Sequence, residues 1–382
     1  MGTYDIKKRT LGFIIFFFSG ICAISSGIIV NLLQEKYGFA YGMTGTLLAL
    51  MSIGNLVAGF VVGILPSKLG MKRTIIVLAS GYGIGYWMMG LSGEIVLLML
   101  AFLLVGIAKG STINICTILV GDNSPNRIKG MNVMHSCYAL GALLCPFVIA
   151  AAIKYNNVLP MFALAISGLV LWLLFVLTPL TGHGNQKNGL TDWSFLKSEK
   201  FWLLTGLLFF QNAAETSVTG WMVTYFKDSG IIAGVLSTYT VTVLWGSTLV
   251  ARLLIAFVLP IKNTYSAMIK MGAACTLFYL GLMLANEQTV AIVLLFAFAF
   301  AMAGMNPMAV ASAGRMTHVT SMGVMLPVAS SGAILMPWMI GMVAEHAGIG
   351  IGMASNIIPC IGMLLFSVLV KRLSEREKAG EL

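Results

Sequence analysis

The chain alternates between long apolar runs and short polar connections. Runs of about eighteen residues or more recur along its whole length, and a helix of that length crosses the hydrocarbon core of a bilayer. Charged residues, Gly, Pro and Asn mark the breaks between the runs. The sequence therefore predicts an all-α membrane protein with twelve transmembrane helices, at 10–33, 42–65, 74–92, 95–120, 131–154, 159–180, 201–227, 235–260, 264–285, 289–314, 321–345 and 348–371.

One long polar connection, residues 181–200, divides the predicted spans into two sets of six. We expect residues 1–180 to form an N-terminal six-helix bundle, and 201–382 to form a C-terminal six-helix bundle with a short cytoplasmic tail. The connection is predicted to be a cytoplasmic linker that contains a short interfacial helix near 192–197. Trp193 and Phe195 would lie at the level of the lipid headgroups there.

The two halves repeat one another. The sequence MNVMHSCYALGALLCPFVI (131–149) aligns without a gap on MGVMLPVASSGAILMPWMI (322–340), and the pairs Gly141/Gly332 and Pro146/Pro337 are both 191 residues apart. The pair Phe17-Phe18 recurs as Phe209-Phe210, 192 residues later. Parallel repeats of six spans predict two pseudo-symmetric bundles.

Composition and charge agree with a membrane protein. The chain is 58% hydrophobic and 9% charged, whereas a soluble domain has about 25% charged residues. The net charge of +10 lies in short connections without a continuous basic stripe, so nucleic acid is not an expected partner. With both termini in the cytoplasm, eighteen Lys and Arg lie inside and three, Lys36, Lys154 and Lys227, lie outside. We expect a bacterial cytoplasmic (inner) membrane and cytoplasmic termini.

The sequence shows no signature of catalysis or of metal binding. The six cysteines fall in apolar segments without a CxxC spacing. The sequence contains no HExxH, nucleophile elbow or phosphate loop, and its four histidines are scattered. We therefore predict neither an enzyme nor a cofactor or metal site.

Glu215 is the acidic residue placed well inside an apolar segment, in 207–226. A carboxylate there costs about 2.5–3.5 kcal/mol on insertion scales, so it requires a partner or a function. Lys109 lies near the middle of the fourth span, in the other half. We predict that the two residues couple proton uptake to transport. A permanent ion pair, snorkelling of Lys109, and a sodium site built from Glu215, Gln211 and Asn212 remain alternatives.

The segment from Gly63 to Arg73 (GILPSKLGMKR) resembles the loop motif between the second and third spans of major facilitator transporters. That motif is a Gly, an Asp, then a Gly followed by basic residues. Gly63 and Gly70 match it, Ser67 stands at the Asp position, and Lys72 and Arg73 supply the basic cluster. The resemblance implies the major facilitator fold, with a central site near mid-membrane lined by the first, fourth, seventh and tenth spans.

Two further stretches, 212–226 and His135-Ser136 with 141–146, resemble the fucose-galactose-glucose:proton symporters. This likeness implies a secondary active transporter that moves a small polar solute, a sugar, by proton-coupled alternating access. An exporter of amphipathic compounds, drug or lipid-like, is the alternative. The drug antiporter signature normally ends in Gly-Pro, and here Cys145 precedes Pro146, which disfavours an antiporter.

A sugar site needs amide partners and an aromatic face. The candidates for substrate binding are Asn114, Gln211, Asn212, Asn306, Trp221 and Trp245. Amides that join helices and rings that only pack are the plainer interpretations. Arg252 is expected to anchor the cytoplasmic end of the eighth span beside an inner gate. The expected partners are the solute, a proton (or sodium) and the bilayer, and the protein is expected to be a monomer.

Overall fold

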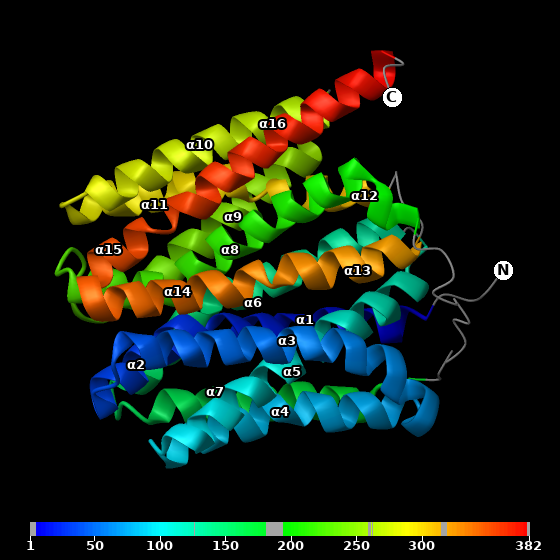
Figure 1. The fold of residues 1–382 in the computed structure, drawn as a ribbon. Helices are drawn as coiled ribbons and strands as arrows, with labels where there is room; N and C mark the ends of the chain where they lie inside the picture. Colours follow the sequence, from blue (N-terminus) through cyan, green and yellow to red (C-terminus); the bar gives the residue numbers. More distant parts are fainter. Residues whose placement is uncertain are drawn as a thin grey trace. The chain divides into compact units, whose positions relative to one another are not determined.

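The computed structural model describes residues 5–125, 127–180, 194–258, 261, 263–314 and 319–379, and every regular element in these ranges is a helix (Figure 1). The first half contains α1 (Ile6–Ile24), α2 (Ser26–Tyr37), α3 (Tyr41–Leu69), α4 (Met71–Leu91), α5 (Ile95–Asp122), α6 (Arg127–Ile153) and α7 (Leu159–Leu177). The second half begins with η1 (Ser194–Lys197), α8 (Glu199–Asp228), η2 (Gly234–Tyr239), α9 (Thr240–Phe257), α10 (Thr264–Leu284) and α11 (Gln288–Met302). It ends with α12 (Met305–Gly314), α13 (Val319–Ser330), α14 (Gly332–Ala347), α15 (Ile349–Ala354) and α16 (Ile357–Ala379).

The helices account for the predicted spans. Within the described ranges, eleven helical segments are long and apolar enough to cross a membrane. α8 has 30 residues, but Gln211, Asn212 and Glu215 lower its hydropathy, and it is the span that completes the set of twelve. The predicted fold class, an all-α membrane protein, is confirmed.

The described chain separates into two compact units. Unit 1 contains α1 to α7 and Gly234–Thr242, and unit 2 contains η1, α8 to Ala233 and the chain from Val243 onward. The sequence assigned 234–242 to the C-terminal bundle, whereas these residues contact α6. The ring of Tyr239 lies 5.1 Å from that of Phe147, and Thr242 Oγ1 donates to the carbonyl of Leu143 at 3.1 Å.

The same close helix contact occurs in both units. In unit 1, a Cβ added to Gly141 of α6 would lie 2.0 Å from the carbonyl oxygen of Phe17 in α1. In unit 2, a Cβ added to Gly332 of α14 would lie 2.1 Å from the carbonyl oxygen of Phe209 in α8. Glycine is therefore required at both positions because the backbones touch. The sequence repeat thus corresponds to a repeated three-dimensional contact.

Four of the described spans are interrupted. Their helices break at Ser25, at 303–304, at Ser331 and at 355–356. Irregular backbone at membrane depth must be satisfied inside the protein, and tyrosines do this at two breaks. The Tyr86 hydroxyl bonds the Cys22 carbonyl beside the first break, and Tyr279 donates to the Met353 carbonyl at 2.7 Å beside the last.

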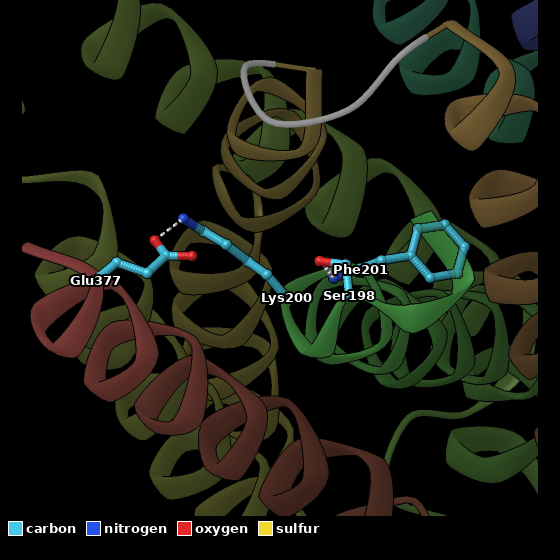
Figure 2. Close-up of polar contacts among 4 residues, drawn as sticks. All are labelled: Ser198, Lys200, Phe201 and Glu377. Carbon is cyan, nitrogen blue, oxygen red and sulfur yellow. Dashed lines mark hydrogen bonds and ion pairs between the residues drawn. The ribbon is translucent and has the colours of Figure 1, made fainter. Parts of the chain in front are cut away.

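The described end of the linker packs onto unit 2. Phe195 of η1 is buried and its ring lies 5.0 Å from that of Phe201. The ring of Phe195 is therefore covered by α8, and its place at the level of the headgroups stays a prediction; Trp193 lies outside the described residues. Figure 2 shows Lys200 at the start of α8 and Glu377 near the end of α16 pointing toward one another, and the two form an ion pair.

The predicted loop motif is mostly helical. α3 continues through 63–69, and the connection to α4 consists of Gly70 alone, with φ of +79°. This positive φ favours glycine, which explains Gly70. Lys72 and Arg73 lie in the first turn of α4, although cations are unfavourable at a helix N-terminus. The side chain of Ser67 and the surroundings of Gly63 lie outside the described structure.

Candidate functional site

Three polar side chains form a hydrogen-bonded chain in unit 2. Gln211 and Glu215 are four residues apart on α8 and therefore share a face of the helix. Gln211 donates through Nε2 to a carboxylate oxygen of Glu215. Asn306 of α12 in turn donates through Nδ2 to Oε1 of Gln211 at 2.8 Å. The network connects the predicted acid of α8 to the helix that follows the break in the tenth span.

Burial differs along this network. Gln211 is 1% exposed, whereas Glu215 and Asn306 are half-buried. The carboxylate accepts from a neutral amide, and no lysine or arginine in the described part of unit 2 lies within ion-pair distance of it. Glu215 is therefore a partly accessible acid whose hydrogen-bonding partner carries no charge. A change in its protonation would alter the bond to Gln211 directly.

Asn212 faces a different helix. Its Nδ2 donates to the Ala329 carbonyl of α13 at 3.2 Å, so it joins two helices as the plainer interpretation anticipated. The Gln211 oxygen already accepts from Asn306. The Asn212 amide thus bonds α13, whereas the Gln211 oxygen bonds α12, and the sodium site stays an alternative. The described residues also hold no group of three or more His, Cys, Asp or Glu side chains suited to a metal ion.

The two candidate tryptophans are packed inside the protein. Trp221 is 0% exposed and donates through Nε1 to the Pro337 carbonyl at 2.9 Å. Trp245 is 6% exposed. Both rings are covered by packing here, so the site proposed below omits them, and their role in binding a solute stays a prediction.

Lys109 and Asn114 belong to unit 1. Lys109 is half-buried on α5. Asn114 is exposed, and its Nδ2 donates to the Gly110 carbonyl one turn earlier at 2.8 Å. Because Lys109 and Glu215 lie in different units, their pairing stays a prediction.

Arg252 reaches further than the sequence suggested. Its half-buried side chain donates through Nε to the Ala303 carbonyl at 3.3 Å, and its role beside an inner gate stays a prediction. Ala303 lies at the break between α11 and α12. The sequence signal for this contact is Pro307, four residues after Ala303, because proline cannot supply the helical N–H that would bond this carbonyl.

Comparison with known proteins identifies a family for the chain. The model described as Major Facilitator Superfamily matches residues 11–337. A gallate transporter of Pseudomonas putida is 23% identical over 159 residues, which is 41% of this chain and 35% of that protein. The chain thus matches about a third of the length of this relative.

Solved structures agree with the fold. The nucleoside transporter NupG, crystallised as a point mutant, is similar with a TM-score of 0.78 at 14% identity, covering 96% of this chain and 99% of that one. An inward-facing, occupied bacterial homolog of the human lysosomal transporter Spinster gives 0.74 at 13% identity, covering 96% and 95%. At such identities the likeness concerns the fold alone.

Proposed function

The chain belongs to the Major Facilitator Superfamily, and we propose that it is a secondary active transporter that moves a small polar solute by proton-coupled alternating access. Transport follows from the family, whereas the solute and the coupling ion are inferred. The observation that carries the coupling is the hydrogen-bonded chain from Glu215 through Gln211 to Asn306. It joins a partly accessible acid on one helix to a broken span.

Protonation of Glu215 would act through this chain. The ionised carboxylate only accepts hydrogen bonds, whereas the protonated acid also donates one. When Glu215 takes up a proton, its carboxyl group becomes a weaker acceptor for Gln211 Nε2, and the Gln211 amide can reorient. Gln211 also accepts from Asn306, so the rearrangement reaches α12, which begins directly after the break at 303–304. Proton binding would in this way bias the position of the broken span.

Lys109 would complete the coupling. An opposite charge from the other half lowers the cost of keeping Glu215 ionised in the membrane. Protonation would release Lys109 and let the halves move. This step comes from the sequence and the family layout, in which half-repeats rock about a central site.

A sugar is the first candidate solute, on the resemblance of 212–226 and of 135–146 to the fucose-galactose-glucose:proton symporters. The gallate transporter among the relatives makes an organic anion the second candidate. An exporter of amphipathic compounds is the third. We further propose a monomer in the bacterial cytoplasmic membrane with both termini in the cytoplasm, on the bias of Lys and Arg among the connections.

The test is uptake by proteoliposomes that contain the purified full chain. Fucose, glucose, uridine and gallate are offered with an inward proton gradient, with a sodium gradient, and with neither. We expect one of them to accumulate with the proton gradient. Glu215→Gln should abolish accumulation and keep exchange of the solute across the membrane. Glu287→Gln, which changes an acid at the start of α11, is the matched control.

Full accumulation by the Glu215→Gln protein would reject the role of Glu215, and accumulation driven by sodium alone would reject proton coupling. A thermal-shift screen distinguishes the proposed symporter from an exporter of amphipathic compounds. Stabilisation by lipophilic cations, without any effect of the four polar compounds, would favour that alternative.

A further inference from the structure

Arg252 carries more hydrogen-bond donors than the Ala303 carbonyl needs. In a regular helix the Ala303 carbonyl would accept from the N–H of residue 307, but Pro307 has none. Arg252 Nε replaces that donor at 3.3 Å. One N–H is enough to replace the missing helical bond, so this contact uses neither the charge nor the other donors of Arg252.

The rest of the guanidinium is available. Arginine carries five N–H donors in a fixed fork, and among the described residues only the Ala303 carbonyl receives one of them. The side chain is half-buried, so the remaining donors at Nη1 and Nη2 are held near the break. No described carboxylate of unit 2 pairs with them. This fork matches a carboxylate with two parallel hydrogen bonds.

The charge of Arg252 indicates the sign of the ligand. Arg252 carries one positive charge inside the predicted eighth span, and no described carboxylate of unit 2 pairs with it. An excess of positive charge at membrane depth is costly, and an anion bound during transport would compensate it. One excess charge suits a monocarboxylate better than a phosphate ester, which carries nearly two charges near neutral pH.

We propose that the transported solute carries a carboxylate, and that the Nη1 and Nη2 groups of Arg252 bind it. This inference rests on the proposed transport function and names the class of its solute. Arg252 then has two roles: Nε holds the broken tenth span, and the outer nitrogens hold the solute beside it. Solute binding at Arg252 would therefore act on the break between α11 and α12, next to Asn306, where the hydrogen-bonded chain from Glu215 ends.

The two roles can be separated by substitution. Arg252→Gln removes the charge but keeps an N–H that can bond the Ala303 carbonyl. Pro307→Ala restores the backbone N–H that this carbonyl lacks, which makes the side-chain donor unnecessary. Lys270→Gln, an exposed lysine on α10 of the same unit, is the matched control for loss of a positive charge.

The experiment measures binding to the purified full chain by thermal shift and by isothermal titration. The probes are benzoate, gallate and lactate, each against its uncharged amide. We expect at least one carboxylate to stabilise the wild-type protein more than its amide does. Arg252→Gln should weaken this binding by about tenfold or more, the range for a lost charged hydrogen bond. The loss should persist in Arg252→Gln/Pro307→Ala, and Lys270→Gln should bind normally.

Three results would overturn the proposal: none of the carboxylates binds, the amides bind equally well, or Pro307→Ala restores carboxylate binding to Arg252→Gln. The last would show that Arg252 acts only on the backbone. Failure of the proposed function looks different, because carboxylates would then bind through Arg252 without being accumulated by a proton gradient. Accumulation of a neutral sugar with no carboxylate binding would keep the function and reject this inference.

Discussion

Asn306 Nδ2 lies 2.8 Å from Gln211 Oε1, and this bond joins α12 to α8. Gln211 is almost fully buried, so its oxygen cannot exchange this donor for bulk water. A buried acceptor without a partner costs about 1–3 kcal/mol. The bond therefore both stabilises unit 2 and extends the network of Glu215 to the broken span.

Asn306→Leu should destabilise the protein by about 1–3 kcal/mol and reduce proton-driven accumulation. Denaturant unfolding in detergent and proteoliposome uptake measure the two effects. Asn114→Leu is the control, because Asn114 is exposed and bonds its own helix; its cost should stay below about 1 kcal/mol. Equal costs for both variants would contradict the special position of Asn306.

Trp221→Phe tests whether that ring binds solute or only packs. The substitution keeps an aromatic ring but removes the N–H that bonds the Pro337 carbonyl, so we expect a loss of about 1–3 kcal/mol of stability. The KM for the transported solute should not change. A KM raised tenfold at unchanged stability would return Trp221 to the solute site.

The fold could be predicted from the sequence because apolar length and the placement of Lys and Arg are properties of single segments. The repeat was visible for a related reason. Gly141 and Gly332 are fixed by backbone contact, which tolerates no side chain, so both copies retain glycine.

The site was less predictable, because it depends on which way each side chain points. Gln211 and Asn212 are adjacent in sequence but bond α12 and α13 respectively. Trp221 looked like a solute-binding ring, and only packing shows it to be fully covered. The contact of Arg252 with the Ala303 carbonyl was not predicted. Pro307 lacks the N–H that would bond this carbonyl, but the sequence alone does not show which side chain replaces it.

Neutralising Lys109 and Glu215 together tests the predicted pairing of the two halves. Breaking a buried ion pair by removing one partner costs about 3–5 kcal/mol, because the other charge is left uncompensated. If the residues pair, Lys109→Gln/Glu215→Gln should cost clearly less than the two single variants combined, measured by unfolding in detergent. Effects that add to within about 0.3–0.5 kcal/mol would show that the two charges act independently.

The ion pair between Lys200 and Glu377 (Figure 2) should contribute little. The two side chains are 14% and 39% exposed, and pairs open to solvent are worth about 0.2–1 kcal/mol. A double-mutant cycle with Lys200→Gln and Glu377→Gln should give a coupling in that range that falls as salt is raised. A larger, salt-independent coupling would instead indicate that the ends of α8 and α16 are locked together.

Alanine at Gly141 or at Gly332 should be strongly destabilising, and by similar amounts. The added Cβ would lie 2.0 or 2.1 Å from a carbonyl oxygen of the facing helix, a distance that only a shift of the two backbones can relieve. We expect losses of about 2–3 kcal/mol or more, at the upper end of the range for overpacking. Gly59→Ala is the control, because a Cβ there meets nothing within 4 Å and alanine favours the helix by about 0.5–1 kcal/mol. Thermal unfolding of the three variants measures these losses. If Gly141→Ala were destabilising and Gly332→Ala were tolerated, the two halves would share a sequence pattern but not the helix contact.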